Sequence, residues 1–140
     1  MFLEIKDFKL KPKARPRIGK GGVYSPTKKN EDALAWKIKE ALLNKGGISQ
    51  YTQDLFVVWI LWSKGNILGD KDNYEKAIYD GLQKSGLIKN DKQIIQGFQV
   101  LHGNMEEEKL IIMIYPLLGE ANLRYVYWDD EIGKEVMSPW

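Results

Sequence analysis

The chain has 140 residues, of which 44% are hydrophobic and 29% charged, a composition typical of one globular domain with a substantial core. Its net charge is only +2, and it has no cysteine and a single histidine, His102. This composition excludes disulfides, cysteine nucleophiles and metal sites built from thiolates or several imidazoles, so any bound metal would have oxygen ligands.

The amino-terminal part is strongly basic. Residues 1–29 carry nine Lys or Arg against Glu4 and Asp7. Residues 3–10 alternate apolar and charged side chains with a slip near Asp7, which predicts an edge strand with one solvent-exposed face. The segment KPKARPRIGKGG that follows, residues 11–22, contains two prolines and three glycines. These residues predict an extended basic loop without regular structure.

This basic arm is suited to binding a polyanion. Lys and Arg side chains contact phosphates and position DNA without reading its base sequence. The candidate DNA-binding residues are Lys11, Lys13, Arg15, Arg17, Lys20, Lys28 and Lys29. The alternative is a solvated loop. The opposite end is acidic, because residues 106–140 carry eight Asp or Glu against three basic residues. The asymmetry predicts a polyanion on one face of the protein.

Two helices and a buried strand follow the arm. Ser25-Pro26 predicts a helix start, since a capping hydroxyl precedes proline at the first helical position, and the helix is expected to reach about Asn44. The run LFVVWILW, residues 55–62, is apolar at every position and predicts a central strand covered on both faces. Apolar residues at helical spacing predict a second helix from Asp72 to about Lys84.

Two further strands are predicted, at 94–101 and 110–115, and the polar segment between them indicates a hairpin. The expected fold is therefore α+β: a single domain over residues 1–140, with a mixed sheet of about four strands and helices packed on its faces. Residues 1–29 would form a strand and the basic arm, and residues 116–140 an acidic, aromatic tail.

Acidic residues gather around the second helix. Asp70 and Asp72 stand at its start, Asp91 follows its end, and Lys76 projects from the same side of the helix as Asp72. Two interpretations are open. Aspartate is a favoured helix cap, and an Asp–Lys pair at this spacing is ordinary surface chemistry. Alternatively, the carboxylates form a metal site. An EF-hand loop does not fit, because Tyr74 occupies a position that needs an acidic ligand.

Residues 70–91, DKDNYEKAIYDGL…GLIKND, resemble the signature of the RusA family of Holliday-junction resolvases, D-x-D-N-x-x-K-x-x-x-D-x-L followed by a D-D or N-D pair. The amino-terminal KPKARPRIGKGGVYSP is similar to that family's basic P-x-R-P-R…G…Y-x-P segment, so the resemblance covers residues 9 to about 101. Many members have two aspartates where this chain has Asn90-Asp91, and we take Asp91 as the functional one.

The resemblance implies a metal-dependent, structure-specific endodeoxyribonuclease that resolves four-way (Holliday) DNA junctions by paired symmetric nicks in recombination and repair. It implies Mg²⁺, with Mn²⁺ as a substitute, bound by Asp70, Asp72 and Asp91. Lys76 completes the catalytic set and supplies a positive charge to the scissile phosphate. The motif also contains Asn73, which either orients a ligand carboxylate or caps the helix, and Asp80, for which a structural role is expected.

Two alternatives remain open: a less selective nuclease for flaps and branched DNA, and a non-catalytic DNA-binding module. Paired nicks and the resemblance both imply a homodimer, with Tyr79 and the two strands at 94–101 and 110–115 as candidate surfaces. The run 55–62 is too short to span a bilayer, and no signal peptide opens the chain. We therefore expect a cytoplasmic, nucleoid-associated protein of a family that is common in prophages.

Overall fold

The structure is a computed structural model that describes residues 1–24, 26–117, 124–129 and 134–139. Its strands are β1 (Phe2–Lys6), β2 (Arg17–Gly19), β3 (Gly22–Tyr24), β4 (Leu55–Trp62), β5 (Ile94–His102), β6 (Lys109–Pro116), β7 (Arg124–Asp129) and β8 (Lys134–Pro139). Its helices are α1 (Lys28–Asn44), α2 (Lys71–Lys84) and the short 3-10 helix η1 (Asp91–Gln93). No helix in this part of the chain has the length and hydrophobicity that a membrane span requires.

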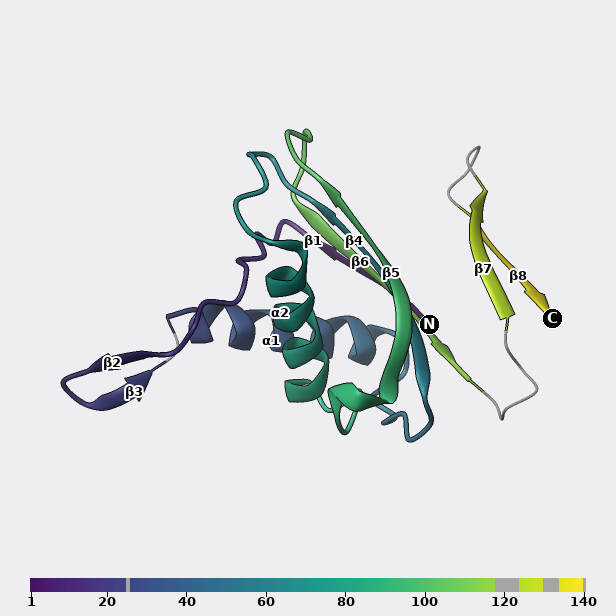
Figure 1. Ribbon diagram of the computed structural model, residues 1–140. Helices are drawn as coiled ribbons and strands as arrows, with labels where there is room; N and C mark the ends of the chain where they lie inside the picture. Colours follow the sequence, from purple (N-terminus) through teal and green to yellow (C-terminus); the bar gives the residue numbers. More distant parts are fainter. Residues whose placement is uncertain (25, 118–123, 130–133, 140) are drawn as a thin grey trace.

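The main sheet has four strands in the order β1-β6-β4-β5 (Figure 1). Strand β4 pairs with β5 in parallel and with β6 in antiparallel orientation, and β1 pairs with β6 in antiparallel orientation. The sheet is therefore mixed, and the predicted α+β class is confirmed. The apolar strand β4 lies inside the sheet and the alternating strand β1 at its edge, as their sequence patterns predict.

Both helices cover the same face of the sheet (Figure 1). On that face, Val57 and Trp59 of β4 belong to one core cluster with the buried side chains of α1 and α2. On the other face, Phe56 and Val58 form a second cluster with strand residues, and no described helical residue belongs to it. The prediction of helices on the faces of the sheet therefore holds for one face.

The predicted hairpin between the strands at 94–101 and 110–115 is wrong. Both strands form, as β5 and β6, but β4 lies between them. A strand that is apolar on both faces excludes water best when it has a neighbour on each side, so β5 and β6 flank β4 instead of pairing with each other. The segment 103–108 therefore connects two strands that are not adjacent in the sheet.

The arm also has more structure than its sequence suggests. Residues 11–22 are not an unstructured loop throughout, because β2 and β3 form a hairpin that projects away from the sheet (Figure 1). Strand β1 ends at Lys6, and the next residue, Asp7, has a φ of 53° that accounts for the slip in the alternating pattern. Helix α1 begins after Thr27, two residues later than predicted, and the proposed cap Ser25 lies outside the described residues.

Part of the tail lies outside the described residues. Residues 118–123, 130–133 and 140 are not described, and β7 and β8 pair in antiparallel orientation.

Gly97 offers a test of the parallel pairing. It lies opposite Val57, and a Cβ atom on Gly97 would collide with the backbone carbonyl oxygen of Val57. Because backbone in the middle of a sheet cannot move aside, Gly97→Ala is expected to lower the free energy of unfolding by roughly 3 kcal/mol. Urea denaturation measures the loss, and Gly65→Ala is the control, since a Cβ there meets no described atom within 4 Å. Equal stability of the two variants would contradict this pairing.

Candidate active site

A pocket of about 530 Å³ lies where the basic arm passes the first turn of α2. Its lining residues are Lys13, Ala14, Arg15, Pro16, Asp70, Asp72, Asn73 and Lys76. The pocket therefore combines two predicted metal ligands, the predicted catalytic lysine and part of the predicted DNA-binding arm. These residues come from two segments that are more than fifty positions apart in the chain.

Asp70 occupies the N-cap position of α2, but its carboxylate does not cap the helix. No side-chain cap hydrogen bond is made, although the backbone carbonyl of Asp70 accepts bonds from the amides of Asn73 (3.0 Å) and Tyr74 (3.3 Å). The Asp70 side chain is exposed at the pocket. The capping interpretation that the sequence left open therefore does not explain this aspartate.

Asp72 and Lys76 do not form the surface ion pair that their spacing permits. Among the described residues, neither side chain has an oppositely charged partner within 4.0 Å. Two carboxylates at one helix start, without a bound partner, repel each other, and a divalent cation with oxygen ligands relieves that repulsion. The chemistry of Asp70 and Asp72 therefore fits a magnesium or manganese ion.

The loop from β4 to α2, which leads to these aspartates, makes contacts at both of its ends. The amide of Ser63 donates to the carbonyl of His102 at 2.8 Å, and the amide of Met105 donates to the carbonyl of Ser63 at 2.8 Å. At its other end, Gly69 lies against the arm, because a Cβ there would be 2.6 Å from the ring carbons of Pro12. Glycine thus allows the arm to pass directly beside Asp70.

The arm is fastened to both helices. The backbone amide of Lys11 donates to the side-chain oxygen of Asn30 in α1 at 2.8 Å, and the Asn30 amide donates back to the carbonyl of Lys9 at 2.9 Å. The backbone amide of Lys13 donates to the carbonyl of Asn73 in α2 at 3.0 Å. These bonds fix the part of the arm that forms one wall of the pocket.

Asp91 does not line this pocket, although η1 leaves its side chain exposed. The side chain of Asn90 accepts a hydrogen bond from the amide of Lys92 at 2.8 Å. Asn90, and not Asp91, therefore caps η1. Among the described residues, no group of three or more acidic or histidine side chains is arranged to hold a metal ion. The structure brings Asp70 and Asp72 together with Lys76, but not with Asp91.

A second acidic side chain, Glu75, lies near Tyr79, as Asp91 does. Glu75 of α2 accepts a hydrogen bond from the indole of buried Trp59 at 3.3 Å and is hydrogen-bonded to Tyr79. Burial raises the pKa of the Tyr79 phenol far above its usual range, and the charges of Glu75 and Asp91 act in the same direction. The sequence analysis did not single out Glu75. Its position four residues before Tyr79 indicates that the two side chains are neighbours on the helix, and this spacing could have identified it.

Tyr79 is therefore not a free surface for dimerisation. Its side chain packs against the main core cluster, which corrects the prediction that it projects from the non-core side of α2. The sequence pattern was misleading because the helix packs across the sheet, and its buried surface is wider than one stripe of apolar residues.

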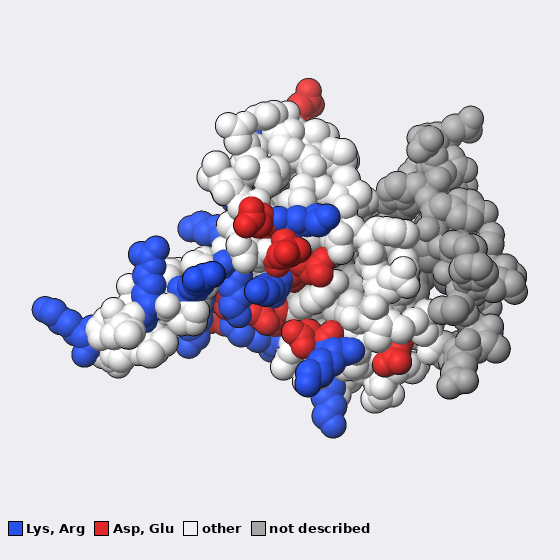
Figure 2. All heavy atoms as spheres, viewed as in Figure 1, with Lys and Arg blue, Asp and Glu red and all other residues white. Residues whose placement is uncertain are grey.

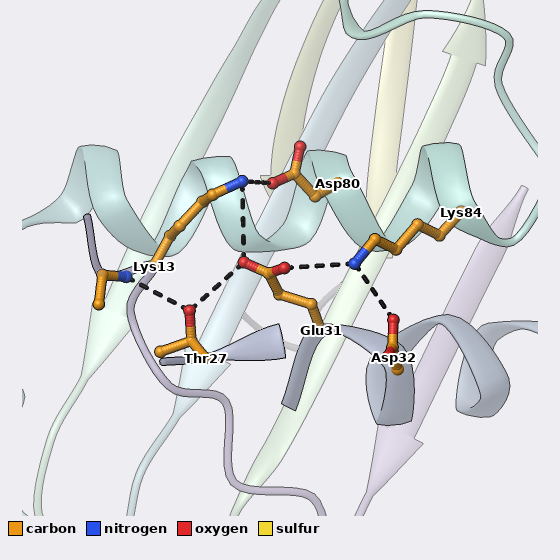
Figure 3. Close-up of polar contacts among 7 residues, drawn as sticks. Lys13, Thr27, Glu31, Asp32, Asp80 and Lys84 are labelled. Carbon is orange, nitrogen blue, oxygen red and sulfur yellow. Dashed lines mark hydrogen bonds and ion pairs between the residues drawn. The ribbon is translucent and has the colours of Figure 1, made fainter. Parts of the chain in front are cut away.

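Most of the predicted DNA-binding residues are exposed. In Figure 2, Lys and Arg side chains gather over the β2–β3 hairpin and next to the acidic side chains of α2. The exposed members are Lys11, Arg15, Arg17, Lys20, Lys28 and Lys29. Lys13 is different, because its ammonium group pairs with Asp80 of α2 (Figure 3). Tyr24, half exposed at the end of β3, lies with its ring over Gly19.

Comparison with known proteins identifies the family of the chain. The family model described as Endodeoxyribonuclease RusA matches residues 7–115. The chain belongs to the RusA endodeoxyribonuclease family. This membership confirms the family identified from the two sequence motifs. The RusA match extends beyond the motif resemblance, which covers residues 9 to about 101, and ends before the tail.

A curated relative supports the same membership. The crossover junction endodeoxyribonuclease RusA of Aquifex aeolicus (strain VF5) is 33% identical over 104 residues, which cover 73% of this chain and 78% of the relative.

The exposed arginines of the arm generate a prediction about binding. Replacing both Arg15 and Arg17 by Ala is expected to weaken binding to DNA of every shape, because phosphate contacts do not depend on sequence or branching. The slope of log K against log salt is expected to fall by about 0.9 for each lost contact. Fluorescence anisotropy at several salt concentrations, with Ca²⁺ in place of Mg²⁺, measures both quantities. A loss confined to branched DNA would show that the arm recognises shape.

Proposed function

We propose that this protein is a metal-dependent, structure-specific endodeoxyribonuclease that resolves four-way DNA junctions by paired symmetric nicks, acting on DNA of the nucleoid in recombination and repair. The observation that carries the proposal is the pocket in which Asp70, Asp72 and Lys76, all without charged partners among the described residues, face the basic arm. The name of the Aquifex relative, a crossover junction endodeoxyribonuclease, supports the choice of substrate.

Mg²⁺ is the proposed cofactor, with Mn²⁺ as a substitute. Asp70 and Asp72 would hold it, with Asp91 as a third ligand. Such an ion, when bound, supplies a more acidic water and neutralises charge on the phosphate.

The remaining groups of the pocket act directly on the DNA. The ammonium group of Lys76 would lie against the scissile phosphate and stabilise the negative charge that develops there during cleavage. Asn73, which lines the pocket, would orient the Asp72 carboxylate or the phosphate through its side-chain amide. The fastened arm would hold the DNA backbone against these groups through the exposed arginines Arg15 and Arg17, which supplies the alignment that cleavage requires.

A homodimer would serve two purposes. It would provide the two active sites that symmetric nicks require. It would also allow Asp91 of one chain to act as the third metal ligand in the site of the other chain. Within one chain, Asp91 lies near Tyr79, which is two helical turns and about 10 Å beyond Asp72 along α2. A second copy that contributed its Asp91 to the pocket of the first would bridge this separation.

The dimer also needs an apolar contact surface. Trp36 and Leu43 are 63% and 65% exposed, and their spacing places them on the same side of α1. Ile95 and Phe98 of the edge strand β5 are 56% and 52% exposed. The surface of α1 replaces Tyr79 as a candidate for self-association, and the edge strand β5 remains one. Strand β6 lies inside the sheet and is largely buried, so it is no longer a candidate.

A substrate panel tests the proposed activity. Synthetic four-way junctions, Y-shaped DNA and linear duplex are incubated with the protein in Mg²⁺, Mn²⁺ or EDTA, and the nicks are mapped on each strand. Paired nicks at symmetric positions in the junction, dependent on the metal, are the expected result. Comparable cutting of Y-shaped DNA would identify a less selective nuclease, and binding without cutting would identify a DNA-binding module.

Neutralising the acidic ligands is expected to separate cleavage from binding. Asp70→Asn, Asp72→Asn and Asp91→Asn would each abolish junction cleavage and leave binding equal or tighter, because each removes a negative charge that repels phosphate. Lys76→Ala would lose cleavage with only a modest loss of binding, as expected for a group that acts mainly in the transition state. Cleavage and anisotropy assays on the same junction measure both effects. If a variant kept more than a few per cent of the wild-type cleavage activity, the replaced residue would not belong to the proposed catalytic set.

Mixing variants tests whether a site is shared between two chains. Sedimentation equilibrium is expected to give twice the chain mass of 16.2 kDa. If Asp91 acts across the dimer, subunits with Asp70→Asn mixed with subunits with Asp91→Asn would form dimers with one intact site. Those dimers would make single nicks in a supercoiled cruciform plasmid. If all three aspartates act within one chain, the mixture would remain inactive, and a monomer in the centrifuge would exclude the dimer.

A further inference from the structure

Five charged side chains connect the basic arm to both helices (Figure 3). Lys13 of the arm pairs with Asp80 of α2, and its nitrogen lies 3.8 Å from a carboxylate oxygen of Glu31 in α1. The other oxygen of Glu31 lies 3.3 Å from the nitrogen of Lys84, which also pairs with Asp32 at 3.1 Å. Glu31 is only 5% exposed, so its charge requires these partners.

The Glu31 carboxylate has one more partner. Thr27 donates its hydroxyl to the same oxygen that faces Lys13, at 3.4 Å, and accepts the backbone amide of Ala14, also at 3.4 Å (Figure 3). Lys13 is thus drawn inward between the helices, and its side chain is 32% exposed. A lysine held in this way is a poor phosphate contact, unlike the exposed arginines that follow it.

The two residues that α2 contributes to this cluster follow the proposed catalytic residues along the same side of the helix. Asp72, Lys76, Asp80 and Lys84 follow one another at intervals of four residues, so each projects next to its neighbour on one side of the helix. Lys76 therefore has a carboxylate one turn before it, Asp72, and another one turn after it, Asp80. A bound metal ion would neutralise Asp72, but it would leave Asp80 able to compete for Lys76.

Lys13 removes this competition. Its ammonium group pairs with the carboxylate of Asp80, and Lys76 has no ion pair among the described residues. A hydrogen bond to Asp80 raises the pKa of Lys13 above its usual value, so Lys13 is charged at neutral pH.

We propose that Lys13 is a positioning residue for DNA cleavage: by pairing with Asp80 it keeps that carboxylate away from Lys76 and leaves Lys76 free to contact the scissile phosphate. The inference rests on the proposed role of Lys76. It assigns Asp80 a reason for its place in the motif, and it removes Lys13 from the DNA-binding set.

The test uses Lys13→Met, which keeps the apolar stem and the backbone bond to Asn73 but removes the charge. Single-turnover cleavage of a four-way junction at saturating protein is expected to slow about twofold, the effect of one ion pair at this spacing on a helix. The second change Asp80→Asn, made in the Lys13→Met protein, removes the competing carboxylate and is expected to restore the rate. Junction affinity in Ca²⁺ and its salt slope should stay unchanged, and Lys37→Met, an exposed lysine of α1, is the matched control.

A second measurement does not depend on cleavage. The rate at which an amine-reactive ester acetylates Lys76, followed by peptide mass spectrometry without DNA or metal, reports whether its amine is free. It should fall in Lys13→Met and recover when Asp80→Asn is added, while thermal unfolding shows that all variants fold. If the wild-type protein cuts no junction, the proposed function fails, and the labelling still decides this inference.

Three results would overturn the inference. Unchanged labelling of Lys76 in Lys13→Met would show that Asp80 does not compete for it. A slower rate that Asp80→Asn does not restore would place the effect of Lys13 elsewhere. A weaker affinity with a smaller salt slope would show that Lys13 contacts phosphate directly.

Discussion

Everything in this fold depends on the burial of one strand. Strand β4 is apolar at every position, and Leu55, Val57 and Trp59 are fully buried on the face that carries the helices. A strand of this kind requires a neighbour at each edge and cover on its faces. The parallel partner β5 needs a crossover, and α2 is that crossover. The burial of β4 thus fixes the place of the helix that carries Asp72 and Lys76.

Helix α2 divides its surface between packing and chemistry. One side buries Tyr74, Ala77 and Ile78 in the core. The other side carries alternating acidic and basic residues, of which the first pair faces the pocket and the second joins the arm through Lys13. Because one rigid helix carries both pairs, the arm is held at a defined position relative to the acidic groups, and the pocket has both signs of charge within a short distance.

The acidic and basic surfaces meet where DNA would bind. An exposed basic hairpin attracts the phosphate backbone over a long range, whereas Asp70 and Asp72 repel it unless a cation is present. Under the proposed mechanism, binding and cleavage would therefore be controlled by different charges. This separation suits a junction-resolving enzyme, which has to bind DNA before it cuts and has to cut only where the backbone reaches the acidic groups.

The sequence determined the two long helices, the four strands of the main sheet and the family, and it nominated the candidate site, since local patterns suffice for these: the apolar run of β4, the helical spacing of α2, and the two motifs that RusA proteins share. It did not determine that β4 separates β5 from β6, or that Tyr79 packs against the core, because both follow from contacts between distant segments. Nor did it distinguish Lys13 from the exposed arginines beside it. That difference arises only when α1 and α2 bring Glu31 and Asp80 to the arm, since a charge becomes a structural partner or a DNA contact according to what folding places around it.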